Sequence, residues 1–279
     1  MDQFNHFESN KIPLVVSGSI SSSAKEILKQ NNINYLDMAG NCFIKDNKGL
    51  YIQIEGKKRE LLRSERKHKA FNKNGIKLIY ALLLNENLVN GTYEEMAKAA
   101  NISKSTVGTI LKDLKEKGYL LQINENLKRL TEVPQLQEKW VHAFNEKLKP
   151  SLLRGKFRFL PKRESDWKSI NLGADTFWGG EPGANILTGF LSPGEWTIYS
   201  TVSKNELLKN LFLVPDPQYG NVSVYNVFWD LNNENFVNKE NKIVNPLLIY
   251  ADLLGTNHSR NFETAQKIYE RELSTYFTE

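Results

Sequence analysis

Hydrophobic positions between Thr92 and Gly118 follow a helical period and predict two helices joined by a short turn. Apolar side chains recur three or four residues apart, which gives each helix one apolar stripe. They are Met96, Ala97, Ala100, Ile102, Val107, Ile110, Leu111 and Leu114. Ile102 falls at the corner between the helices, and Ser103 is placed to cap the second one. The pattern therefore predicts a helix-turn-helix pair.

The neighbouring segments extend this pair into a winged helix-turn-helix. The apolar run over Ile76–Leu84 predicts a preceding helix, and Tyr119–Leu130 predicts a hairpin with Asn124–Asn126 at its tip. In such a module the second helix of the pair enters the major groove of DNA. A helical pair that binds only protein is the other reading, and we favour DNA binding.

Before residue 60 the pattern changes and predicts a small α/β unit. Pro13–Val16 is a short apolar strand, and Ala24–Gln30 is a helix. Two further strands are predicted over Asn34–Ile44 and Leu50–Glu55, with a Lys/Asp/Asn/Gly turn between them. This unit occupies residues 1–60.

Three residues of this unit resemble the core of PD-(D/E)xK nucleases. Asp37 lies in one predicted strand, and Glu55 and Lys57 end the next. In such a core the two carboxylates hold Mg²⁺ and the lysine orients or activates the attacking water. No nearby segment is predicted to supply the helix and strand that complete that core. We therefore favour a nuclease-like but inactive, or purely structural, unit over a working nuclease.

After the hairpin, Val133–Leu148 predicts one more helix, which Pro150 closes. Its apolar positions share one face, so the helix is expected to pack against a neighbouring domain or a second copy of the chain. These positions are Leu136, Trp140, Val141, Phe144 and Leu148. Together with a basic linker, the winged helix and this extension occupy residues 61–149.

Residues 150–279 predict a separate α/β domain. The predicted strands are Leu153–Phe159, Glu195–Ser200 and Asn221–Trp229, and the predicted helices are Lys204–Leu211, Pro246–Leu254, one that starts at Pro182 and one that Asn261 caps. Glu181, Asp252 and Glu263 fall at predicted helix ends, where charge complementarity with the helix dipole explains them. The whole chain is predicted to be an α+β multidomain protein.

Charge supports a nucleic-acid partner. The net charge is +5, and the stretch from Lys57 to Lys69 alone holds seven Lys/Arg against two Glu. A basic run directly before a winged helix favours binding to a polyanion. We expect DNA contacts from the second helix, the hairpin and the linker, namely from Ser103, Lys104, Ser105, Thr106, Thr109, Lys112, Lys128, Arg129, Arg63, Arg66 and Lys67.

Other chemistry has little support. Cys42 is the only cysteine, so no internal disulfide and no thiolate metal cluster is expected. The four histidines lack the spacing of metal ligands, and we expect no cofactor. The longest apolar runs are too short to cross a bilayer, and the first residues lack the apolar core of a signal peptide. A cytoplasmic protein without a membrane partner is expected.

Six segments together resemble the AbiEi family of antitoxins from type IV toxin–antitoxin (abortive infection) systems. They are INYLDMAGNCFI (33–44) with GLYIQIEGKK (49–58), TVGTILKDLKEKGYLL (106–121), WGGEPGANILTGFL (178–191), NPLLIYADLL (245–254) and RNFETAQKIYE (260–270). The resemblance covers most of the chain in the expected order, and the segments at 178–191 (WGGEP) and 245–254 (YADLL) are its more specific markers.

The resemblance implies a transcriptional repressor that binds repeats in its own promoter through the winged helix. It also implies that the C-terminal domain counteracts a nucleotidyltransferase toxin without requiring a stable complex. A Mg²⁺-dependent nuclease, whose winged helix selects the target, is the alternative. A gene for a nucleotidyltransferase-like protein directly downstream would favour the repressor and antitoxin.

Overall fold

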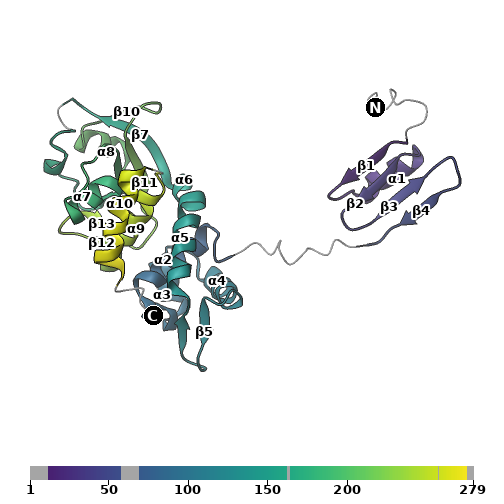
Figure 1. Cartoon of the computed structure of the whole chain (residues 1–279), viewed down its shortest axis with the longest axis horizontal. Coiled ribbons are helices and arrows are strands. Elements are labelled where there is room, and N and C mark those ends of the chain that lie inside the picture. The colour runs from purple at the N-terminus through teal and green to yellow at the C-terminus, as the bar shows by residue number, and fades with distance from the viewer. Residues whose placement is uncertain (1–11, 58–68, 162–163, 257, 275–279) are drawn as a thin grey trace. The chain divides into compact units, whose positions relative to one another are not determined.

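The computed structural model describes residues 12–57, 69–161, 164–256 and 258–274 (Figure 1). The chain divides into two units, Met1–Arg66 and Lys67–Glu279. Both units mix helices and sheets, as the sequence predicts. In the described residues no helix is both long enough and apolar enough to cross a membrane.

The first unit is a four-stranded sheet with one helix. In chain order its elements are β1 (Leu14–Ser17), α1 (Ser22–Gln30), β2 (Asn34–Asp37), β3 (Cys42–Lys45) and β4 (Tyr51–Ile54). The strand order follows the chain, with β1 and β2 parallel and the remaining neighbours antiparallel. The Ser21 side chain caps α1 by accepting from Ala24 N. Buried Tyr35 and Phe43 stack at the centre of the sheet.

The single strand predicted over Asn34–Ile44 is wrong, because a tight turn divides it into β2 and β3. Asp37 ends β2, and its Oδ1 accepts from the backbone N–H groups of Ala39 and Asn41 at 3.0 and 2.9 Å. Gly40 takes a φ of +82°, which a residue with a Cβ rarely adopts. An Asp-x-x-Gly-Asn turn therefore interrupts a run that reads as continuous strand.

The second unit begins with three helices and a hairpin. They are α2 (Lys73–Leu84), α3 (Tyr93–Ala99), α4 (Lys104–Glu116), β5 (Leu120–Gln122) and β6 (Lys128–Leu130), with a short 3₁₀ turn, η3 (Glu86–Asn90), after α2. Thr92 and Glu95 form a capping box at the start of α3. Gly118, with a φ of +79°, ends α4 and turns the chain into the hairpin. The predicted apolar stripes are buried except at Ile102, which is half-buried.

The extension after the hairpin does not end at Pro150. Helix α5 (Val133–Ala143) continues through a π-helical segment, η4 (Phe144–Leu148), into α6 (Lys149–Leu152). Pro150 lies in the first turn of α6, where the missing N–H of proline costs little. All five apolar positions predicted for this helix are buried.

A seven-stranded sheet fills the rest of the unit. Its strand order is β10-β7-β11-β9-β8-β13-β12, in which β11 with β9 and β13 with β8 are parallel and the other pairs antiparallel. The strands are β7 (Leu153–Phe159), β8 (Thr176–Gly179), β9 (Trp196–Ser200), β10 (Leu213–Pro215), β11 (Val222–Asn226), β12 (Val237–Asn238) and β13 (Ile243–Val244). The helices are α7 (Gly180–Thr188), α8 (Lys204–Asn210), α9 (Pro246–Leu254) and α10 (Ser259–Ile268), joined by short turns η5 (Trp167–Ser169) and η6 (Glu234–Phe236) and followed by η7 (Tyr269–Leu273).

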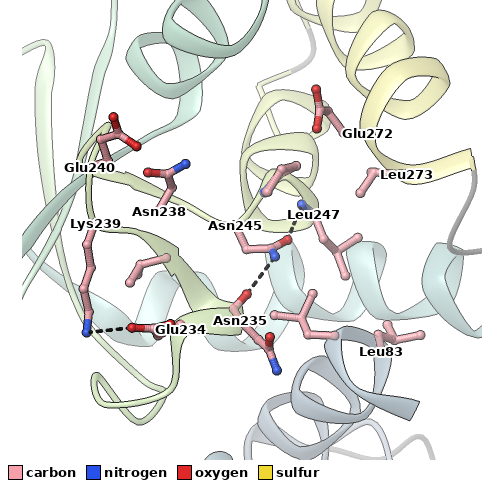
Figure 2. Close-up of a pocket in the computed structure, with 13 residues that line it drawn as sticks. Leu83, Glu234, Asn235, Asn238, Lys239, Glu240, Asn245, Leu247, Glu272 and Leu273 are labelled. Carbon is pink, nitrogen blue, oxygen red and sulfur yellow. Dashed lines mark hydrogen bonds and ion pairs between the residues drawn. The ribbon is translucent and has the colours of Figure 1, made fainter.

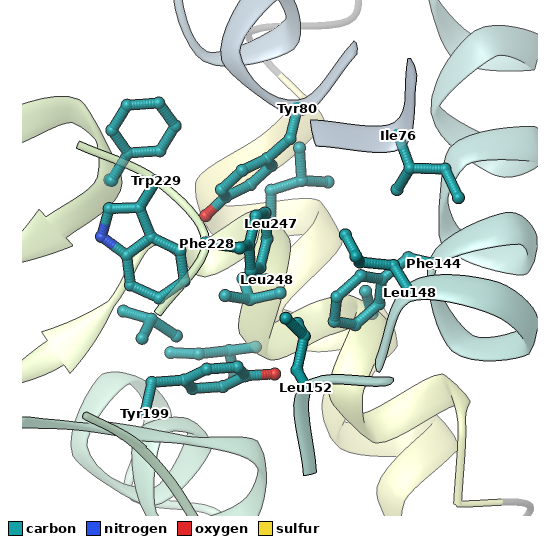
Figure 3. Packing of buried hydrophobic residues seen from close by; sticks show 14 of the residues in the cluster. Ile76, Tyr80, Phe144, Leu148, Leu152, Tyr199, Phe228, Trp229, Leu247 and Leu248 are labelled. Carbon is teal, nitrogen blue, oxygen red and sulfur yellow. The ribbon is translucent and has the colours of Figure 1, made fainter. Parts of the chain in front are cut away.

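One aromatic core joins the helices before residue 149 to the sheet after residue 150 (Figure 3). Trp140 of α5 stacks on Tyr80 of α2 with ring centroids 5.0 Å apart, and on Phe144 at 5.3 Å. Tyr80 in turn packs against Phe228 and Phe236 at 5.4 and 5.3 Å. The side chains on the two sides of the boundary that the sequence placed at 149/150 therefore share one core and one unit.

Candidate functional site

The first two turns of α4 present polar side chains to solvent. Lys104, Ser105 and Thr109 of these turns are exposed and Thr106 is half-buried, while Ser103 before the helix and Lys112 in its third turn are exposed as well. The opposite side of the helix is buried through Val107, Ile110, Leu111 and Leu114. This division leaves a thin, polar surface at the amino end of α4, while the apolar side fixes the helix on α2 and α3.

Ser103 occupies the N-cap position of α4, but its side chain does not cap the helix. Its hydroxyl instead pairs with the hydroxyls of Thr106 and Ser105, at 2.6 and 3.2 Å. Thr109 Oγ1 donates to the Thr106 carbonyl at 2.8 Å. The Ser103 hydroxyl therefore accepts from no backbone N–H of the first turn, and Thr106 N donates instead to the Ser103 carbonyl at 3.0 Å.

The hairpin places basic side chains beside the same helices. Arg129 is exposed and Lys128 is half-buried. The main chain of Lys128 is held to Asn90 of η3, since Lys128 N donates to Asn90 Oδ1 at 2.7 Å and Asn90 Nδ2 donates to the Lys128 carbonyl at 3.0 Å. The linker residues Arg63, Arg66 and Lys67 lie outside the described residues.

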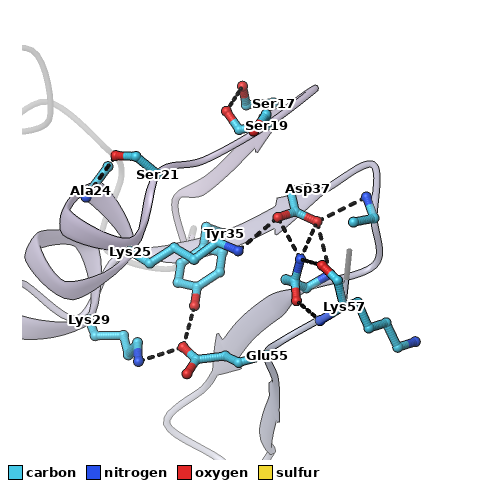
Figure 4. Close-up of polar contacts among 12 residues, drawn as sticks. Ser17, Ser19, Ser21, Ala24, Lys25, Lys29, Tyr35, Asp37, Glu55 and Lys57 are labelled. Atoms are coloured by element: carbon cyan, nitrogen blue, oxygen red, sulfur yellow. Dashed lines mark hydrogen bonds and ion pairs between the residues drawn. The ribbon is translucent and has the colours of Figure 1, made fainter. Parts of the chain in front are cut away.

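Each carboxylate of the nuclease-like trio has its own lysine partner from α1 (Figure 4). Lys25 Nζ lies 2.9 Å from Asp37 Oδ2, and Lys29 Nζ lies 2.5 Å from Glu55 Oε1. The hydroxyl of Tyr35 also donates to Glu55, at 2.9 Å. Hydrogen bonds from Lys29 and Tyr35 lower the pKa of Glu55. Both carboxylates are therefore engaged as anions within the unit.

The geometry does not favour a catalytic role for Lys57 or a metal ion held by Asp37 and Glu55. The main chain of Lys57 exchanges two hydrogen bonds with the Asn41 side chain, while its own side chain is directed away from Asp37 and Glu55 (Figure 4). Nowhere in the described part of the chain do three or more His, Cys, Asp or Glu side chains form a group suited to a metal ion.

We expect the first unit to lose stability in acid because of Asp37. Burial raises the pKa of Asp37, but hydrogen bonds from Lys25 and Asn41 outweigh it and bring the pKa to about 2, below its ordinary value of 3.8. A lowered folded-state pKa stabilises the fold above the ordinary value, and the benefit is lost as the pH falls from about 4 to 2. Amide NMR signals of residues 12–57 followed across this range should show it, and Asp37→Asn should flatten the dependence. An Asp37 carboxyl that titrates near pH 4 would contradict it.

Two buried carboxylates of the second unit, those of Glu181 and Asp252, are held by more than a helix dipole. Glu181 is 2% exposed and lies in the first turn of α7, as the dipole argument requires. Its carboxylate also accepts from Arg260 Nη2 at 2.8 Å and from the backbone N–H of Gly194 at 2.7 Å. Burial raises the pKa of Glu181, but these bonds and one from Asn261 lower it overall. Asn261 lies inside α10, whose N-cap is His258, and its side chain is buried. The prediction that Asn261 caps this helix is wrong.

Asp252 contradicts the dipole explanation. It lies near the carboxyl end of α9, where the helix dipole disfavours an anion, and is 1% exposed. Its carboxylate accepts from Lys149 Nζ at 2.7 Å, from the hydroxyl of Tyr199 at 2.9 Å and from Gly180 N at 3.1 Å. Glu263 lies within α10 and is exposed, so it also does not mark a helix end.

Tight packing explains the glycines of the WGGEP segment. A Cβ on Gly179 would lie 2.7 Å from Asp252 Oδ2, and one on Gly180 would lie 2.6 Å from Thr197 Oγ1. Gly180 also has a φ of +46°. These glycines let α7 start directly against α9 and β9, two residues before the predicted start at Pro182. The role is structural, and it orders the ends of α7 and α9 around the two buried carboxylates.

Comparison with known protein families shows which family the chain belongs to. The family model of the transcriptional regulators described as AbiEi antitoxins of type IV toxin–antitoxin systems matches residues 129–274, more than half of the chain. The chain belongs to the AbiEi family. The match confirms the family resemblance and includes the buried carboxylates of Glu181 and Asp252, while α4 lies before it. No curated protein and no solved structure matches the chain.

Proposed function

We propose that this AbiEi-family regulator binds double-stranded promoter DNA through a winged helix made of α2, α3, α4 and the β5–β6 hairpin. The observation that carries the proposal is the exposed polar start of α4, whose opposite side is buried. Short hydroxyl side chains and Lys104 allow the helix end to approach base edges in the major groove. Lys128 and Arg129 on the hairpin are suited to phosphate contact.

The proposal extends to control of a toxin. In this reading DNA binding represses the protein's own operon, and the part matched by the AbiEi family counteracts a nucleotidyltransferase-like toxin without a stable complex. Co-expression with the protein encoded next to it tests this reading. Growth arrest by the neighbour alone and growth restored by this chain would support it, and arrest that this chain does not relieve would contradict it.

Substitutions on the hairpin and on α4 should separate phosphate contact from base contact. Each phosphate contact that is lost lowers the slope of log K against log salt by about 0.9. Lys128→Ala and Arg129→Ala should therefore lower the affinity for operator and random DNA alike and give a shallower salt slope. Thr106→Ala and Thr109→Ala should weaken the free energy of binding to the operator by about 1–3 kcal/mol and change binding to random DNA little. Fluorescence anisotropy across a salt series measures both effects.

Lys209→Ala is the matched control for the charge substitutions. Lys209 is exposed on α8, in the part of the second unit that follows the hairpin, and its removal changes the net charge by the same amount. The DNA affinity and the salt slope of the Lys209→Ala protein should equal those of the wild type. If Lys209→Ala changes the slope as much as Arg129→Ala does, the hairpin has no special role in binding.

We also propose that Asp37, Glu55 and Lys57 are structural and that the protein is not a nuclease. The support is that α1 lysines neutralise both carboxylates. Purified protein incubated with Mg²⁺ or Mn²⁺ should leave linear and supercoiled DNA intact. Metal-dependent cleavage that Glu55→Ala abolishes would establish the nuclease alternative, with the winged helix as its targeting part.

A further inference from the structure

A groove at the carboxyl end of α2 combines an apolar floor with an acidic rim (Figure 2). Its volume is about 550 Å³. Leu84 of α2 and Pro246 of α9 contribute half-buried apolar side chains to the floor, over the buried Leu83, Leu247 and Leu273. Glu240 and Glu272 lie at the rim. Segments from both ends of the second unit therefore line one groove.

The rim carries a net negative charge, because its lining in the described part of the chain holds three glutamates and one lysine. Lys239 is paired with Glu234 at 3.9 Å. In the described part of the chain, neither Glu240 nor Glu272 takes part in an ion pair. The chain as a whole has a net charge of +5, so the charge of this rim is opposite in sign to the net charge of the chain. It repels nucleic acid and favours a cationic ligand.

The edge of the large sheet also reaches this groove. Val237 and Asn238, which line it, make up β12. Among the described strands, β12 pairs with β13 alone and is the last strand on that side. Edge strands recognise extended segments by adding a strand, and alternate side chains of the added segment then face the same pocket.

We propose that this groove binds an extended segment of a partner protein in which apolar and basic side chains alternate. The apolar side chains occupy the floor above Leu83, Leu247 and Leu273, and the basic ones pair with Glu240 and Glu272. The site is separate from the polar start of α4, so this proposal does not depend on DNA binding.

A labelled octapeptide that alternates valine and lysine is the probe. Fluorescence polarisation with the full chain should give saturable binding, and an octapeptide that alternates valine and glutamate should bind at least tenfold more weakly. The double variant Glu240→Lys/Glu272→Lys should weaken binding of the valine–lysine peptide at least tenfold. Circular dichroism should show the wild type and the double variant equally folded, because both substituted side chains lie at the rim.

A second double variant separates local from overall charge. Glu206→Lys/Glu263→Lys changes the net charge equally at two exposed sites outside the groove, and it should bind the probe within twofold of the wild type. Equal losses in the two doubles would overturn the proposal, as would the absence of saturable binding. Two further results would also overturn the proposal. If a chain truncated after residue 274 binds the probe tenfold more tightly, the protein's own last residues fill the groove. If the protein self-associates and Glu240→Lys/Glu272→Lys abolishes this, a second copy of the chain fills it.

Discussion

Replacing Trp140 by alanine is expected to destabilise the whole second unit by about 3–5 kcal/mol, the usual cost of removing a buried aromatic side chain. Trp140 is fully buried, stacks on Tyr80 and Phe144, and donates from Nε1 to the Ile76 carbonyl at 2.9 Å. Its loss removes the contact between α2, α5 and the rings that continue into the sheet. Because these elements share one core, the helices and the sheet should unfold together.

Urea denaturation read by circular dichroism gives the size of this effect, and hydrogen exchange gives its extent. Amides of α4 and of β9 should lose protection at the same denaturant concentration in Trp140→Ala. Tyr219→Ala is the control, because that side chain is 79% exposed and its removal should change stability by no more than about 0.5 kcal/mol. Two separate transitions, with the sheet unaffected by Trp140→Ala, would contradict a shared core.

Removal of either member of the Lys149–Asp252 pair is expected to cost about 3–5 kcal/mol. The Asp252 side chain is 1% exposed and the Lys149 side chain 14% exposed, so the remaining charge would stay buried without its partner. Asp252→Ala also leaves the Tyr199 hydroxyl and Gly180 N–H without their acceptor. Differential scanning calorimetry of Asp252→Ala and of Lys149→Ala measures the loss.

A double replacement tests whether the uncompensated charge causes that loss. Lys149→Met/Asp252→Leu removes both charges and keeps apolar volume, so it should recover a large part of the stability lost in either single variant. Recovery should stay incomplete, because the hydroxyl of Tyr199 still lacks an acceptor. If each single variant cost less than about 1 kcal/mol, the pair would have no structural importance.

Elements with a clear local pattern could be predicted from the sequence. The strand over Leu153–Phe159 and the helix over Pro246–Leu254 have the predicted bounds. The apolar stripe of α4 is buried where its period places it. In each case the residues that decide the element lie within one or two turns of each other, or alternate along one strand, so no distant contact is needed to recognise it.

Elements that depend on distant contacts could not be predicted. Strands β12 and β13 contain two residues each and exist because they pair with each other and with β8. The break between β2 and β3 depends on the Asp37 side chain, which a pattern of apolar residues does not register. Short strands and side-chain turns thus fall outside what periodicity detects.

The candidate site divides in the same way. Exposure of Ser103, Lys104 and Thr109 follows directly from the helical period, because these positions lie opposite the buried stripe. The partners of Asp252 come from three separate segments, at Lys149, Gly180 and Tyr199. Only the folded chain brings them together. A buried acid in the sequence cannot be told from an exposed one at a helix end until its partners are known.

Direct comparison of operator and random DNA tests the central claim that this AbiEi protein is a sequence-specific DNA-binding regulator. Wild-type protein is titrated into a promoter fragment from its own operon and into random DNA of equal length, across a salt series. We expect the promoter to be bound more tightly, by a factor of at least about 10³ near physiological salt, and log K to fall linearly with log salt for both DNAs. Equal affinity for the two DNAs at every salt concentration would contradict it.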